Sequence, residues 1–171
     1  MISGDSPPVT IRPERTGDHA AVRLVNELAF GRPEEAMLVE ALRRAARPGI
    51  SLVAVAGHIF LSPVRMNPAG DGIIAMGLAP MAVHPDHQRR GIGSMLVREG
   101  LRACRAIGAN VVVVLGHPGF YPRFGFIPAA ARGLRSRYDV PDEAFMVVEL
   151  EPGILDGREH MVEYMPEFAE I

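Results

Sequence analysis

The sequence contains a single cysteine, Cys104, among its 171 residues, and it lacks any long apolar run. One cysteine excludes an intramolecular disulfide and is typical of a protein in a reducing compartment. The most apolar stretch, residues 111–115, is far too short to span a bilayer. The N-terminus has no basic start followed by an apolar segment, so no signal peptide is visible. We therefore expect a cytoplasmic protein.

Excess charge is also scarce, because 18 basic and 20 acidic residues give a net charge of only −2. This balance provides no electrostatic footprint for nucleic acid or for an anionic membrane, so we expect neither as a partner. The histidines show no close spacing with cysteine or aspartate that would indicate a metal site. Hydrophobic residues make up 48% of the chain, as in ordinary soluble proteins. The expected organisation is one domain spanning residues 1–171.

Hydrophobic periodicity predicts strands and helices along the whole chain. Strands are predicted at residues 9–12, 51–55, 58–64, 73–83, 111–115, 144–150 and 158–164. Helices are predicted at residues 18–30, 34–46 and 91–107, with a short helical turn at 119–124. In the first helix, Asp18 is the expected N-cap, and Val22, Val25 and Leu28 recur at helical spacing.

The strands and helices at residues 73–115 predict a right-handed parallel crossover. The remaining strands have hairpin-length connections and are expected to be antiparallel. Pro80 interrupts the strand before the crossover and cannot donate a ladder hydrogen bond, so it predicts a local bulge. Gly108 follows the third helix, where a left-handed cap is favoured. The predicted fold class is α/β, a mixed sheet with helices on both faces.

A glycine-rich turn joins the strand at residues 73–83 to the third helix. Gly91 and Gly93 lie where unpaired N–H groups at a helix start bind phosphate oxygens, and the absence of a Cβ lets an anion approach the backbone. Arg89 and Arg90 add positive charge, and Ser94 adds a hydroxyl donor. Gly-x-Gly alone also fits a plain turn. The dinucleotide fingerprint and the P-loop are both excluded, because their further glycine or lysine is missing.

Two segments of this region resemble a known family, the GCN5-related N-acetyltransferases (GNAT superfamily). They read Met81-Ala82-Val83-His84-Pro85 followed by Gln88-Arg89-Arg90-Gly91-Ile92-Gly93, and Gly116-His117-Pro118-Gly119-Phe120-Tyr121-Pro122-Arg123-Phe124-Gly125-Phe126. The first resembles the family signature Gln/Arg-x-x-Gly-x-Gly/Ala, and the second resembles the family's Tyr-x-x-x-Gly-Phe segment. The wider sequence is most similar to the bacterial YhbS-like subgroup of predicted N-acetyltransferases.

The resemblance implies a GNAT fold with a splayed parallel strand pair, and transfer of an acetyl group from acetyl-coenzyme A (acetyl-CoA) to an amine without a metal. The residues implied in cofactor binding are Met81, Ala82, Val83, Gln88, Arg89, Arg90, Gly91, Ile92, Gly93, Ser94, Phe120 and Phe124. An amide near Met81 or Ala82 would polarise the thioester carbonyl. Tyr121 matches the tyrosine that commonly protonates the departing thiolate, although a packing role beside the neighbouring phenylalanines is the alternative.

The acceptor half of the reaction is open. The attacking amine must lose a proton, and His58, His84, His117, Glu27 and Glu149 are only candidates for the base. The acceptor is a small-molecule or peptide amine, in a pocket expected between the first two helices and the C-terminal strands, where no charged cluster stands out.

Three further points stay open at this stage. Arg132, Arg135 and Arg137 are either solvated or within reach of the cofactor's nucleotide phosphate. A homodimer is compatible with the family. The alternatives to catalysis are a noncatalytic acyl-CoA binding or sensing module and a loop that binds another phosphate ligand.

Overall fold

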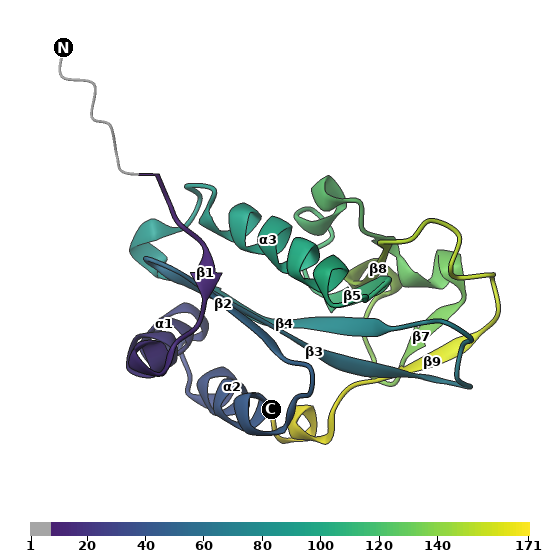
Figure 1. The fold of residues 1–171 in the computed structure, drawn as a ribbon, viewed down its shortest axis with the longest axis horizontal. Coiled ribbons are helices and arrows are strands. Elements are labelled where there is room, and N and C mark those ends of the chain that lie inside the picture. The colour runs from purple at the N-terminus through teal and green to yellow at the C-terminus, as the bar shows by residue number, and fades with distance from the viewer. Residues whose placement is uncertain (1–7) are drawn as a thin grey trace, which may run out of the picture.

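The structure is a computed structural model that describes residues 8–171, without the side chain of residue 170, and it has a central sheet between helices (Figure 1). The helices are α1 (His19–Phe30), α2 (Glu34–Ala45) and α3 (Ile92–Ala106). The strands are β1 (Arg12–Pro13), β2 (Ile50–Ala54), β3 (Gly57–Asn67), β4 (Ala75–Val83), β5 (Val111–Leu115), β6 (Ile127–Pro128), β7 (Leu134–Ser136), β8 (Phe145–Glu149) and β9 (His160–Glu163). Short 3-10 turns are η1 (Thr16–Asp18), η2 (Pro85–His87), η3 (Tyr121–Phe124), η4 (Ala129–Arg132), η5 (Asp142–Ala144) and η6 (Pro166–Glu170).

The strands pair in the order β1-β2-β3-β4-β5-β8-β6. Strand β9 pairs antiparallel with the C-terminal end of β3, at residues 65–67. Strands β4 and β5 are parallel and are connected through α3, whereas the other pairs on this path are antiparallel. This arrangement confirms the predicted mixed, mostly antiparallel sheet. The expectation that every other pair would be antiparallel is wrong for β7 and β9, which pair in parallel. Strand β7 has only three residues, too few for its pattern to be recognised.

The predicted elements agree with the structure to within a few residues, with three informative details. The first strand is shorter than expected, because only Arg12–Pro13 pairs with β2. Asp18 precedes α1 but does not cap it with its side chain, since its carboxylate accepts hydrogen bonds from Arg12 and from the amide of Arg15. The bulge predicted from Pro80 is confirmed by a register shift in the β3–β4 ladder, and Gly108 has the predicted left-handed conformation, with φ of +84°.

The sheet separates two apolar layers, with α3 on one face and α1 and α2 on the other (Figure 1). Alternation along β3 assigns the side chains to these layers, because successive residues of a strand point to opposite faces. Ile59 and Leu61 pack with α3, whereas Phe60 packs with Leu42 of α2. Leu28 was expected on the apolar face of α1, but it is 43% exposed.

Helix α3 approaches the sheet closely at two glycines. A Cβ at Gly57, the first residue of β3, would lie 2.9 Å from Leu96 Cδ1 and 3.0 Å from Ile92 Cγ2. A Cβ at Gly100 would lie 3.0 Å from Leu61 Cδ1. Both contacts are tighter than ordinary van der Waals packing, so these glycines set how deeply the start of α3 sits on the strands.

Replacing Gly57 by alanine is therefore expected to lower the free energy of unfolding by about 1–3 kcal/mol, the usual cost of overpacking a core. Urea denaturation monitored by circular dichroism measures the change. Gly17→Ala is the matched control, since a Cβ at Gly17 has no neighbour within 4 Å. Equal stability of the Gly57 and Gly17 variants would show that α3 adjusts freely to the sheet.

Candidate functional site

Strands β4 and β5 part from each other halfway along β4. Their parallel pairing runs from Ala75 opposite Val111 to Leu78 opposite Val114, and β4 then continues to Val83 without β5. Over this last stretch β4 pairs only with β3. One edge of residues 79–83 therefore faces the gap between the strands, and its backbone groups are available to a bound ligand that pairs like an added strand. Met81, Ala82 and Val83, predicted to bind the cofactor, lie on this stretch.

The loop from β4 to α3 presents a series of amides without partners. Within the described part of the chain, no hydrogen bond is donated by the amides of residues 89–94, and the next amide, of Met95, donates to the Gly91 carbonyl. Arg89 and Gly91 both have left-handed backbones, with φ of +61° and +87°. Turns of this kind gather successive N–H groups into an anion-binding concavity, and the positive end of the α3 dipole adds to it.

Residues of the two family-like segments meet at Gly93. A Cβ at Gly93 would lie 3.6 Å from Phe120 Cζ, 3.7 Å from Met81 Cε and 3.8 Å from Val83 Cγ2. The structure thus brings the end of β4, the start of α3 and η3 together, as the sequence predicted.

Two predicted cofactor residues use their side chains within the protein. Gln88 donates from Nε2 to the Val83 carbonyl at 3.1 Å, and Ile92 is buried in the core under α3. Contact of these two residues with a cofactor is therefore expected from their backbones.

Four arginines without a carboxylate partner among the described residues surround this meeting point. Arg89 and Arg90 belong to the loop, Arg98 lies over the Phe124 ring at 5.2 Å, and Arg123 lies over the Phe120 ring at 4.8 Å. Sequence reasoning missed Arg98 and Arg123. The helical spacing of Arg98, four residues after Ser94, was the signal that could have found it.

Tyr121 begins η3, and its ring is buried against the gap between the strands. A Cβ at Gly116, directly after β5, would collide with the Tyr121 ring, so the absence of that Cβ makes room for it. Phe120 and Phe126 pack edge-on against the ring at centroid distances of 5.0 and 5.6 Å. The hydroxyl has no hydrogen-bond partner among the described residues, and it is not fully enclosed. Burial raises the pKa of Tyr121 to about 12, so the hydroxyl keeps its proton near neutral pH.

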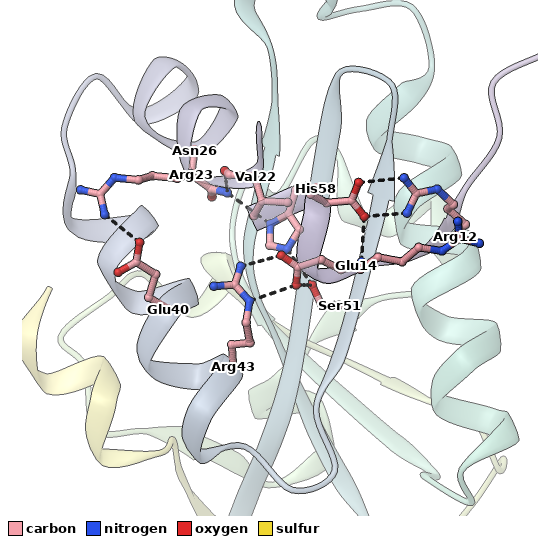
Figure 2. Close-up of polar contacts among 11 residues, drawn as sticks. Arg12, Glu14, Val22, Arg23, Asn26, Glu40, Arg43, Ser51 and His58 are labelled. Carbon is pink, nitrogen blue, oxygen red and sulfur yellow. Dashed lines mark hydrogen bonds and ion pairs between the residues drawn. The ribbon is translucent and has the colours of Figure 1, made fainter. Parts of the chain in front are cut away.

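His58, one of the candidate bases, lies inside a buried polar network (Figure 2). Asn26 Nδ2 contacts its Nδ1 at 3.2 Å, and Ser51 Oγ contacts its Nε2 at 3.0 Å. Ser51 donates in turn to Glu14, which also pairs with Arg43 at 2.5 Å. Burial lowers the pKa of His58 to about 4. With both ring nitrogens engaged and no exposed surface, His58 joins α1 to β2 and β3 and is not placed to accept a proton from an acceptor amine.

The carboxylate candidates for the base are engaged by arginines. Glu27 pairs with Arg23 at 2.9 Å, and Glu149 pairs with Arg132 at 2.7 Å. Among the histidines, the side chain of His84 accepts a hydrogen bond from the Asp86 amide, and His117 is exposed.

The arginines of the 132–137 segment are likewise engaged by carboxylates. Arg135 and Arg137 pair with Glu159 and Glu163, as Arg132 does with Glu149. All three ion pairs lie at the surface, since the arginine side chains are 46–66% exposed.

The described residues contain no group of three histidine, cysteine, aspartate or glutamate side chains able to hold a metal ion. None of the helices in residues 8–171 is long and apolar enough to cross a membrane.

Comparison with known proteins gives consistent results. The sequence model of the acetyltransferase (GNAT) domain matches residues 10–129. The uncharacterized N-acetyltransferase YhbS of Escherichia coli K12 is 35% identical over 92% of this chain and 97% of its own length. The crystal structure of E. coli YhbS in complex with CoA matches with a TM-score of 0.86 and 32% identity, over 96% of this chain and 95% of that one. A GNAT acetyltransferase of Brucella melitensis in complex with acetyl-CoA matches with a TM-score of 0.76 and 37% identity, over 94% and 98% of the two chains.

The buried imidazole of His58 should make the free energy of unfolding depend on pH. Its pKa is lower in the folded protein than the ordinary 6.5, so the unfolded chain binds more protons between pH 6.5 and 4. The free energy of unfolding should therefore fall as the pH is lowered through this window, by up to roughly 3 kcal/mol from this group. His58→Gln keeps a neutral hydrogen-bonding side chain and should lack this contribution. Denaturation curves at pH 4.5 and 7 measure it, and an identical pH dependence in both proteins would contradict the assignment.

Proposed function

This chain belongs to the GNAT family of acetyl-CoA-dependent N-acetyltransferases, and from that premise we propose that it acetylates a small-molecule or peptide primary amine by direct attack of the amine on the thioester. The observation that carries the proposal is the convergence of three features. The unpartnered amides of residues 89–94, the free edge of β4 and the Tyr121 ring all border the gap between β4 and β5. On the sequence grounds given above, we also propose that it acts in the cytoplasm.

The donor half of the site fits coenzyme A. The amides of residues 89–94 suit the pyrophosphate, since they are unpaired and converge at the positive end of a helix. Arg89 and Arg90 add charge there, and the free edge of β4 suits the amide groups of the pantetheine arm. Phe120 and Phe124 border the same region, beside Met81 and Gly93.

The reacting end of the site lies at the bulge of β4. A backbone N–H near Met81 or Ala82, on the edge that β5 leaves unpaired, would donate to the thioester oxygen as negative charge develops on it. The attacking amine forms the new C–N bond while the C–S bond breaks. A fixed backbone dipole stabilises this transition state with little reorganisation.

Tyr121 is proposed to donate a hydrogen bond to the departing sulfur. Its pKa of about 12 is well above the value of about 8.5 for an ordinary thiol. Complete proton transfer from tyrosine to thiolate is therefore unfavourable, and hydrogen-bond donation to the developing charge is the role that its burial supports. Because the candidate carboxylates are held by arginines, a water chain is proposed to take the proton of the amine.

Tyr121→Phe removes only this hydroxyl and should lower kcat about 10²-fold, because a positioned donor is lost while the ring still packs on Gly116. Thiol release from acetyl-CoA measures kcat over a panel of amines, and calorimetry measures CoA affinity, which should be unchanged. Full activity of the variant would remove Tyr121 from the mechanism. CoA binding by the wild-type protein without turnover of any amine would favour a noncatalytic binding or sensing module.

The double change of Arg89 and Arg90 to glutamine should weaken CoA binding roughly tenfold, since two phosphate-facing charges are lost. The loss should shrink at high ionic strength, because these side chains are exposed and their charges are screened by salt. Arg105→Gln is the matched control: Arg105 is exposed and lies in the last turn of the same helix. Calorimetry measures the Kd for CoA of each protein at two salt concentrations. If Arg105→Gln weakened CoA binding as much as the double variant, a local phosphate contact would be refuted.

A further inference from the structure

A surface hollow on the α1–α2 side of the sheet has an unbalanced charge. Its lining includes Ala45, Arg47, Arg65, Arg137, Glu163 and Tyr164. These residues come from the end of α2, from β3 and from the C-terminal part of the chain. This is where the acceptor pocket was expected, but the sequence showed no charged cluster there, because the charged residues are far apart along the chain.

Three guanidinium groups line this hollow, and two of them share its one carboxylate. Glu163 pairs with both Arg65 and Arg137 and also accepts a hydrogen bond from Asn67. Arg47 donates to the Ala46 carbonyl and has no carboxylate partner in the described structure. The side chains of Arg65 and Arg137 are 85% and 65% exposed, so their N–H groups remain available to a ligand. The lining therefore carries a net positive charge.

Tyr164 connects the hollow to the gap between β4 and β5. Its ring lies on β4, because a Cβ at Gly77 would lie 2.8 Å from Tyr164 Cε1. Gly77 directly precedes Leu78, where the pairing of β4 with β5 ends. Burial raises the pKa of Tyr164, and the nearby hydroxyls of Tyr138 and Tyr121 raise it further. The Tyr164 ring therefore lies beside the end of the β4–β5 ladder, on the face of the sheet opposite to Tyr121.

Two enclosed oxygens on this path have no hydrogen-bond partner within the described residues. One is the Tyr164 hydroxyl, and the other is Ser62 Oγ. Ser62 is paired with Gly77 across the β3–β4 ladder, so its side chain lies on the same face as the Tyr164 ring. An unsatisfied buried hydroxyl is destabilising, and an amine in the hollow supplies an N–H donor that the Tyr164 oxygen lacks.

Resting on the function proposed above, we infer that this hollow is the acceptor site and that it selects primary amines carrying a carboxylate or phosphate group. Arg65, Arg137 and Arg47 hold the anionic group, while the Tyr164 hydroxyl directs the amine toward the gap. A second hollow, beside Glu14 and Arg43, does not suit this role as well, because its strand residues belong to the β1–β2 edge of the sheet and not to the end of the β4–β5 ladder.

Matched pairs of amines test the selection, with CoA release from acetyl-CoA as the readout. β-Alanine is compared with its amide for the carboxylate, and O-phosphoethanolamine is compared with ethanolamine for the phosphate. The charged member of at least one pair should have a kcat/KM at least tenfold above its neutral partner, and the pair that shows the difference identifies the anionic group. Equal values within both pairs would overturn the inference.

Variants locate the effect in this hollow. Joint replacement of Arg65 and Arg137 by glutamine should raise KM for the charged amine about tenfold, with kcat and the neutral amine unaffected. Arg135→Gln is the matched control, since Arg135 lies in β7 beside these residues but pairs with Glu159 outside this hollow. Tyr164→Phe should raise KM for both members of a pair, because it removes a contact to the amine itself. A control variant as impaired as the double variant would contradict the assignment.

The outcomes separate this inference from the proposed function. If every amine fails while CoA still binds, catalysis is refuted and the acceptor site falls with it. If neutral amines are acetylated as well as charged ones, the enzyme function stands and only the selection is refuted.

Discussion

The parting of β4 from β5 is the constraint on which the rest of the site depends. A parallel ladder that continued past Leu78 would pair the backbone of residues 79–83 on both edges and leave nothing for a ligand. Pro80 helps to prevent this, because it has no N–H and because the bulge around it shifts the register against β3. Unpaired backbone groups are costly when a site closes over them without partners. A ligand bound in the gap would therefore supply hydrogen-bond partners for backbone groups of β4 that the fold leaves unpaired.

Glycines decide what can approach this gap from each side. Gly57 and Gly100 let α3 settle deeply on the sheet, which fixes the helix start that bears the unpartnered amides. Gly116 makes room for the Tyr121 ring on the α3 face, and Gly77 makes room for the Tyr164 ring on the opposite face. Two tyrosine rings thus pack on the β4–β5 pair from opposite faces, at Gly116 directly after β5 and at Gly77 within β4. A side chain at either of the last two glycines would displace the ring that it faces.

Periodicity and turn chemistry predicted much of this fold, because both are local properties. The strand at residues 111–115 is apolar throughout and is buried on both faces, and Pro80 indicated the bulge directly. The glycines at 91 and 93 indicated, for the same reason, the turn whose amides have no partner among the described residues. The role of Asp18 was wrong because Arg12, six residues away, competes for its carboxylate, and an isolated helix-capping rule contains no such competitor.

The rest of the site depends on contacts between residues far apart in the sequence. Nothing near His58 in the chain shows that Asn26 and Ser51 enclose its ring, and nothing near Glu163 shows that Arg65 will share it with Arg137. Ion pairing also explains why the net charge of the chain does not reveal where unpaired arginines gather. The overall value of −2 is a sum over the whole chain, in which paired charges cancel locally.

Among the described residues, the arginines without a carboxylate partner include 89, 90, 98 and 123 near the start of α3 and 47 in the opposite hollow. In the same hollow, Arg65 and Arg137 divide a single glutamate. Under the proposed acceptor specificity, two anionic substrates would approach one gap and repel each other, and cationic groups on separate faces of the sheet would neutralise each without a shared counter-charge. The distribution of unpaired arginine, rather than total charge, then matches this fold to the proposed ligands.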